Sequence, residues 1–300
     1  MSTATDSPSA SKIGSFGNSF WLALLAISVI VFGANTGVAT YQGSRLSGAS
    51  TGASDMRVLS QQLANQGREA VAGNAEAFKA FKETKQSVES TVADLQSRFG
   101  NEGAIAGPLA KLSATWAPLG KSADQIVASE AAVLALAGNA DRFATQVPNL
   151  QAQLNEVVRA MSAGGAPSSQ IYSALQQVVL AGTMARRVTE IRAGGAGAAT
   201  AGDALGRDAV LFGQVLDGLR DGNPDLGIAA VRNGAALAAL QNSQTLWTAM
   251  KKDLDAILAS SRNLFAAQAA ATALTNGSGQ MLQDSTNLFQ AFSAFGSVRD

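Results

Sequence analysis

Hydrophobic residues recur at steps of three and four along most of the chain after residue 55, a spacing typical of amphipathic helices packed in a bundle. Gly, Asn and Pro break this pattern at intervals and divide it into long segments. We therefore expect four long helices. Their approximate ranges are 55–99, 104–163, 168–222 and from 225 onward.

Some breaks fall inside these predicted helices. Pro118 and Pro148 should kink the second helix, since proline removes a backbone donor and crowds the preceding turn. The third helix, capped by Ser168 or Ser169, passes a Gly/Ala stretch at 193–202. An Asn-Gly-Ser-Gly segment interrupts the fourth. Four antiparallel helices, or six if the chain reverses near residues 147 and 277, return the chain to the end where it started.

The hydrophobic pattern also repeats itself. Trp116 and Trp247 are 131 residues apart. The same offset aligns four further pairs: Leu109 with Leu240, Leu119 with Met250, Ile126 with Ile257, and Val133 with Leu264. Self-similarity at a fixed offset indicates repeated structural units. The sequence therefore predicts an all-α fold, an elongated antiparallel helical bundle built from two tandem repeat modules at 55–167 and 168–300.

The most apolar stretch lies near the amino terminus. Phe20–Phe32 is an apolar run of 13 residues, and the charge-free segment Phe16–Ala39 extends it to 24, long enough to span a bilayer. Trp21 and Tyr41 stand where aromatic rings prefer the membrane interface. We expect a disordered cytoplasmic tail at 1–15, a transmembrane helix at 16–41 and a juxtamembrane segment at 42–54.

Two alternatives remain open for this apolar run. A cleavable signal peptide has an apolar core of similar length, and Gly37-Val38-Ala39 resembles its cleavage site. A retained anchor leaves Lys12 on the cytoplasmic side and exports the residues after about 41. Gly33 and Gly37 have the spacing that lets two membrane helices approach closely, and they are the predicted dimer contact of a homodimer.

The composition excludes several classes of function. The chain has no cysteine and no histidine, which removes thiol nucleophiles, His-based triads and zinc sites of the usual kind. Its 22 basic and 22 acidic residues leave no net charge to neutralise nucleic-acid phosphates. Asp253 and Asp255 are two residues apart and fall on different helix faces, so they form no catalytic pair. We expect no enzymatic activity, no metal site and no cofactor.

Several motifs occur in a specific order along the chain. They are Leu59-Ser60-Gln61-Gln62-Leu63-Ala64, Gly73-Asn74-Ala75-Glu76-Ala77-Phe78 and the turn Asp221-Gly222-Asn223-Pro224. With the apolar run before them, the chain resembles the N-terminal anchor and sensory region of the PilJ family of type IV pilus chemoreceptors, which are methyl-accepting chemotaxis transducers. The resemblance spans essentially the whole chain and rests on the order and spacing of these motifs.

This resemblance implies a location, partners and a role. It implies a bacterial inner-membrane receptor whose periplasmic helical domain senses pilin or a small ligand and governs twitching motility by helix displacement. An adaptor and a histidine kinase would be reached through a cytoplasmic part that this chain does not contain, together with a second membrane helix and a relay domain. Membrane lipid is the other expected contact.

Related helical sensor domains, including those of nitrate-responsive histidine kinases, bind a small anion at an arginine early in their first helix. By this resemblance the expected ligand-binding residues are Arg57, with Ser60 and Gln61 after it, and Arg186 in the second module. Two arginines at a dimer axis are able to hold an anion in a bidentate manner. The alternative function is a membrane-tethered structural helical protein without signalling output.

Overall fold

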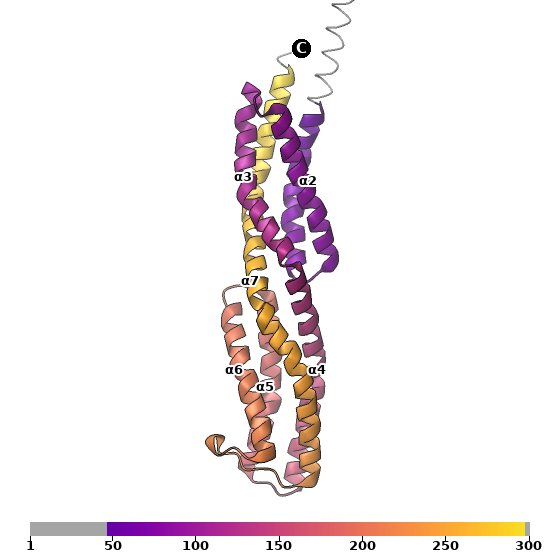
Figure 1. Ribbon diagram of the computed structural model, residues 1–300, viewed down its shortest axis with the longest axis vertical. Helices are drawn as coiled ribbons and strands as arrows, with labels where there is room; N and C mark the ends of the chain where they lie inside the picture. Colours follow the sequence, from indigo (N-terminus) through magenta and orange to yellow (C-terminus); the bar gives the residue numbers. More distant parts are fainter. Residues whose placement is uncertain (1–46, 298–300) are drawn as a thin grey trace, which may run out of the picture.

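The computed structural model describes residues 47–297, and its regular elements in this range are helices, with one isolated bridge between Asn223 and Ile228 (Figure 1). This confirms the all-α prediction. In chain order the helices are residues 47–71, α2 (Ala75–Phe99), α3 (Gly103–Ala128), α4 (Glu130–Ala163), α5 (Ser168–Ala193), α6 (Ala198–Asp221), the short 3-10 helix η1 (Pro224–Leu226) and α7 (Gly234–Ser297).

Two long rods and two hairpins make up this fold. One rod is α3 followed by α4, with only Ser129 between them, and the other is α7, which is 64 residues long. The hairpin of the 47–71 helix and α2 lies along one half of the rods, and the α5–α6 hairpin lies along the other half (Figure 1). We call the half that contains residue 47 the first bundle and the other half the second bundle.

The chain runs along the long axis of the molecule six times rather than four. The two rods cover the full length, and each of the four hairpin helices covers one half (Figure 1). Residue 47 and the carboxyl end of α7 lie at the same end (Figure 1), as the predicted topology requires. The two extra reversals do not fall near residues 147 and 277, where the sequence offered them. They fall at 72–74 and at 194–197, inside the predicted first and third helices.

Glycine explains both unexpected reversals. Gly73 has φ of 98°, and Gly194 and Gly195 have φ of 74° and 87°, a left-handed region that residues with a Cβ rarely adopt. Asn74 then caps α2, since its side-chain oxygen accepts a hydrogen bond from the Ala77 amide at 3.1 Å. The predicted continuation of helix through both segments was therefore wrong.

In α7 the prediction was wrong in the opposite sense: a break was predicted where the helix is continuous. It continues through 276–279, where an interruption was predicted, because Gly277 packs directly against the Leu119 side chain of α3. It begins at Gly234 rather than near residue 225. The segment before it folds over the end of the second bundle, with Ile228 and Val231 buried. Tertiary contacts override local propensity at both places.

Other predicted boundaries were right. α2 ends at Phe99, α4 at Ala163 and α6 at Asp221, close to the predicted breaks. Pro118 and Pro148 lie inside α3 and α4 without ending them. The predicted serine cap of α5 was wrong: Pro167 occupies the N-cap position and no side chain caps the helix.

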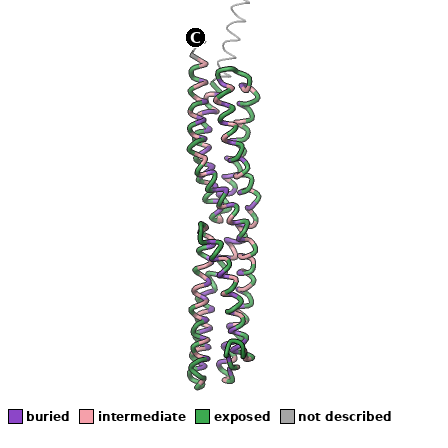
Figure 2. The backbone as a smooth tube through the Cα atoms, turned by 90° about the vertical axis from the view of Figure 1, so that its left-hand side faces the viewer, coloured by how far each residue is buried: buried purple, intermediate pink, exposed green. Residues whose placement is uncertain are grey.

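The hydrophobic seams predicted from the sequence form the core. Buried residues line the inner faces of the helices in both bundles (Figure 2). Trp116 and Trp247 are both buried, and the Trp247 ring contacts Phe212 with centroids 4.4 Å apart. At the other end of the rod, Phe99 and Phe292 meet edge to face at 5.0 Å.

The amino-terminal predictions lie largely outside the described residues. The predicted membrane helix at 16–41 is among them. Within residues 47–297 no helix is both long and apolar enough to cross a bilayer. Residues 47–54 of the predicted juxtamembrane segment are helical, and Ala49 and Ala53 are buried in the first bundle. Each half of the chain supplies one hairpin and one rod, while the division into repeat modules at 167 stays a prediction.

Gly277 and Gly279 test the packing of α7. A Cβ at Gly277 would overlap Leu119, whereas a Cβ at Gly279 has no atom within 4 Å. We expect Gly279→Ala to stabilise the chain by about 0.5–1 kcal/mol, the gain typical of alanine over glycine in a helix. Gly277→Ala should instead cost about 1–3 kcal/mol through overpacking. Urea denaturation of both variants checks this, and equal stabilisation by both would contradict the close contact.

Lys85 gives the first bundle a pH dependence. Its ammonium lies 2.7 Å from Glu89 and 2.8 Å from Asp124 of α3. Burial lowers the pKa of Lys85, but the hydrogen bonds to Asp124 and Glu89 and their charges outweigh it and raise the pKa above its usual value. This stabilisation is complete below the unfolded-state pKa of about 10.4 and is lost as pH rises through the higher folded-state pKa.

We therefore expect Lys85→Met to be less stable than the parent chain by about 1 kcal/mol at pH 8. The difference should shrink when the parent lysine loses its proton above pH ~10.5. Urea denaturation of both chains at pH 8, and again above the raised folded-state pKa of Lys85, measures the stability difference at each pH. A difference that is unchanged or larger at high pH would contradict the assigned ion pairs.

Candidate ligand-binding groove

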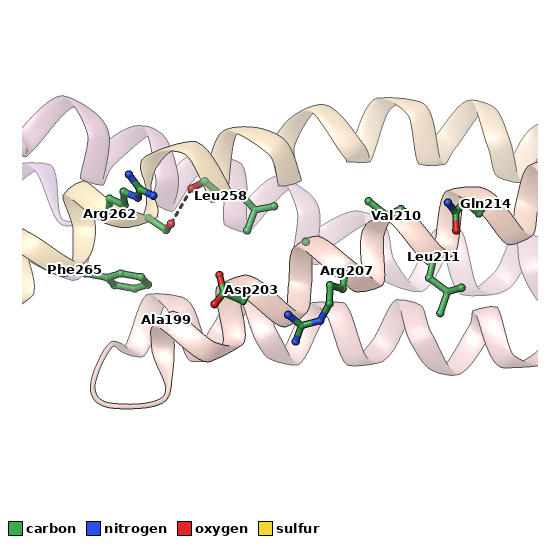
Figure 3. Close-up of a pocket in the computed structure, with 12 residues that line it drawn as sticks. Ala199, Asp203, Arg207, Val210, Leu211, Gln214, Leu258, Arg262 and Phe265 are labelled. Atoms are coloured by element: carbon green, nitrogen blue, oxygen red, sulfur yellow. Dashed lines mark hydrogen bonds between the residues drawn. The ribbon is translucent and has the colours of Figure 1, made fainter.

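A groove with a volume of about 760 Å³ lies between α6 and α7 (Figure 3). It exists because α6 presents small residues there. A Cβ at Gly206 would lie 3.8 Å from Leu258 Cδ1, and one at Gly202 would have no atom within 4 Å. With no side chains to fill the space, the two helices leave room for a small molecule.

The groove combines apolar walls with unpaired charges. Leu258 and Phe265 of α7 face α6 across it, and Asp203 lies on the α6 side (Figure 3). Arg207 of α6 and Arg262 of α7 also line it, and within residues 47–297 no ion pair involves either arginine or Asp203. Such a site suits a small molecule with an apolar body and a charged group.

One neighbouring ion pair joins α5 to α6. Arg187 of α5 donates to Asp208 of α6 at 2.6 Å, and both side chains are less than one-third exposed. This ion pair links α5 to α6, so the Arg187 guanidinium is already bound to a carboxylate. Arg207 and Arg262 are exposed and make no ion pair within residues 47–297, which leaves them available to a ligand.

The α5–α6 hairpin also carries an exposed apolar face. Tyr172, Val179 and Leu175 on α5 are 61%, 66% and 46% exposed, and Leu211 of α6 adds to them beside a hollow of about 460 Å³. Residues 168–185 include no charged side chain. Contiguous exposed apolar side chains are characteristic of interaction sites, whereas isolated ones are ordinary. We call these four residues the apolar face.

Several carboxylates near the groove have structural partners. Asp253 accepts hydrogen bonds from Arg142 at 2.8 and 3.1 Å, and Asp255 pairs with Lys251 at 2.7 Å. In the first bundle the buried Asp284 accepts a hydrogen bond from Thr115 at 2.6 Å. Among the described residues no group of carboxylates could hold a metal ion.

The structure separates the ligand-binding residues expected from the sequence. Arg57 and Gln61 are exposed on the 47–71 helix, and Ser60 between them is buried, donating to the Arg57 carbonyl at 3.1 Å. Arg186 lies on α5 in the second bundle and donates to Thr183 at 3.2 Å. One chain therefore does not bring Arg57 and Arg186 together. Gly33 and Gly37 lie outside the described residues.

The groove residues were missed by the sequence analysis. Gly202 and Gly206 are one helical turn apart on α6, a spacing that leaves one helix face without side chains. That spacing could have indicated an open helix face from the sequence alone. The sequence could not indicate that this face lies against Arg262 and Phe265, because that depends on the chain reversal at 194–197.

No protein-family model matches the chain. Two curated proteins are similar to it over most of its length. The methyl-accepting chemotaxis protein AlkN of Alcanivorax borkumensis is 34% identical over 285 residues, which is 92% of this chain and 41% of AlkN. Protein PilJ of Pseudomonas aeruginosa is 32% identical over 277 residues, 90% of this chain and 40% of PilJ.

The chain thus spans about two-fifths of the length of these relatives. Similarity at this level over nine-tenths of the chain confirms the resemblance to PilJ-like chemoreceptors that the sequence motifs indicated.

Proposed function

We propose that this chain, similar to PilJ and AlkN over nine-tenths of its length, is the sensory region of a methyl-accepting chemotaxis-type transducer that controls type IV pilus twitching motility. In this proposal the segment 16–41 anchors it in the inner membrane, and the helical rod stands in the periplasm. The similarity to these two proteins is the observation that carries the proposal.

The topology of the rod supports signal transfer along α7. A helix of 64 residues is about 96 Å long. It contributes to the groove in the second bundle and ends beside residue 47 at the opposite end of the rod. Because an unbroken helix moves as a unit, a shift imposed at the groove would reach the end of the first bundle.

The signal would then be a choice between two packings of α7. A ligand shifts such an equilibrium only by its difference in affinity for the two arrangements. The groove meets this requirement, since α6 and α7 form its opposite walls and any change in their separation alters the site. An adaptor and a histidine kinase would receive the signal through a cytoplasmic part, in a homodimer.

Pilin is the proposed protein ligand, and the apolar face is its proposed docking site. This face lies on the second bundle, far from residue 47, where a periplasmic partner has free access in the proposed orientation (Figure 1). The absence of charge over residues 168–185 suits an apolar contact rather than an ion-paired one.

Two exposed valines supply a matched test of docking. Val179 lies on the apolar face and is 66% exposed, whereas Val58 lies on the first bundle and is 57% exposed. We expect Val179→Lys to weaken pilin binding roughly ten-fold or more, since a lysine would be desolvated in the contact. Val58→Lys should leave the affinity unchanged. Biolayer interferometry with immobilised type IV pilin and the full 300-residue chain measures both.

Either of two results would contradict the docking proposal. One is equal loss of affinity in both variants, which would indicate a general effect of added charge. The other is no binding of pilin to the parent chain at high concentration, which would favour a membrane-tethered structural protein.

A further inference from the structure

A second recess lies at the junction of the two bundles. It has a volume of about 400 Å³ and is lined from three directions. The 47–71 helix contributes Arg68, the end of α5 contributes Arg192, and the middle of α7 contributes residues from Gln268 to Asn276. We call it the junction pocket. It is separate from the groove between α6 and α7, with which it shares no lining residue.

The charges that line the junction pocket are all positive. Its lining includes two arginines and no carboxylate. Within residues 47–297 Arg68 makes no ion pair, and Arg192 is paired only with the exposed Asp141 of α4. Guanidinium groups are the side chains that recognise carboxylate and phosphate oxygens most effectively, through two parallel N–H donors.

The third component is an amide with free donors. Asn276 lines the pocket from α7, its side chain is exposed, and the described part of the chain offers it no hydrogen-bond partner. Thr272 and Thr275 also line the pocket, but their hydroxyls donate to backbone carbonyls of α7 at 2.9 and 3.0 Å. The donors available to a ligand are therefore those of Arg68 and Asn276, together with the guanidinium N–H groups of Arg192 that do not donate to Asp141.

The wall that carries Arg192 is held firmly in place. Gln268 of α7 donates from Nε2 to the Arg192 carbonyl at 3.0 Å. A Cβ at Gly194, two residues later, would overlap the Gln268 side chain, so the reversal lies directly against α7. This arrangement presets the backbone position from which Arg192 extends, so less of the chain has to be ordered when a ligand binds.

From this arrangement we infer that the junction pocket binds a small dianion, an oxyanion or a dicarboxylate, held by Arg68 from the first bundle and Arg192 from the second. Asn276 supplies neutral donors from the rod that both bundles share. Because the two arginines belong to different bundles, the bound anion bridges them and favours one relative position of the two. Anion binding does not depend on the proposed sensory function.

Isothermal titration calorimetry of the full chain in mild detergent tests this inference. Inorganic phosphate and succinate serve as probes, titrated at constant ionic strength against chloride. We expect saturable binding of at least one probe, and Arg68→Gln should weaken it roughly ten-fold or more, the usual loss for one charged hydrogen bond. Asn276→Ala should weaken it to a smaller degree.

Two exposed cations elsewhere on the chain serve as controls. Arg232→Gln and Lys79→Gln each remove a positive charge that lines neither the junction pocket nor the groove, so neither should alter the affinity. All three variants that remove a positive charge should fold, because Arg68, Arg232 and Lys79 make no ion pair within residues 47–297. Circular dichroism verifies their helical content.

Two outcomes would overturn the inference. The first is the absence of saturable binding for both probes up to about 10 mM, an affinity too weak to use. The second is equal weakening by Arg68→Gln and either control, which would indicate a general electrostatic effect. Neither bears on pilin binding, so failure here and failure of the proposed sensory role are separable.

Discussion

Close packing of the rods depends on one constraint, the fit of α7 against α3 and α4 along nearly its whole length. The contact of Gly277 with Leu119 brings α7 against α3 in the first bundle, and the pair of Asp253 with Arg142 links it to α4 in the second. Neither hairpin spans both bundles. The two rods therefore set the relative position of the bundles, and the hairpins packed on the rods take their positions from them.

The candidate sites follow from where this packing is incomplete. Glycines on α6 leave the groove open against α7, and the junction pocket forms where the two hairpins end beside the same rod. Both recesses include α7 in their walls, so an occupant of either one contacts the helix that runs to the end beside residue 47. In the proposed sensory role, α7 would be one output helix shared by two ligand inputs.

Sequence periodicity predicted the helices and the core because it reports which face of a helix is apolar. Phe78, Leu112 and Trp247 are buried where the pattern places them. Periodicity did not distinguish a glycine that reverses the chain from one that lets two helices touch. Gly194 has positive φ, while Gly277 stays helical against Leu119, and only the tertiary partner decides between them. The missed reversal at 194 also hid the proximity of Arg68 and Arg192, which no local pattern reveals.

Hydrogen exchange of the α7 backbone amides tests the central claim most directly, because the account requires one unbroken helix shared by two bundles. It predicts that the amides of 274–283 exchange as slowly as the buried stretches on either side of them, since the helix is closed against α3 there. Rapid exchange confined to 276–279, between protected flanks, would show a break in the rod and would contradict the proposed transfer of a signal along it.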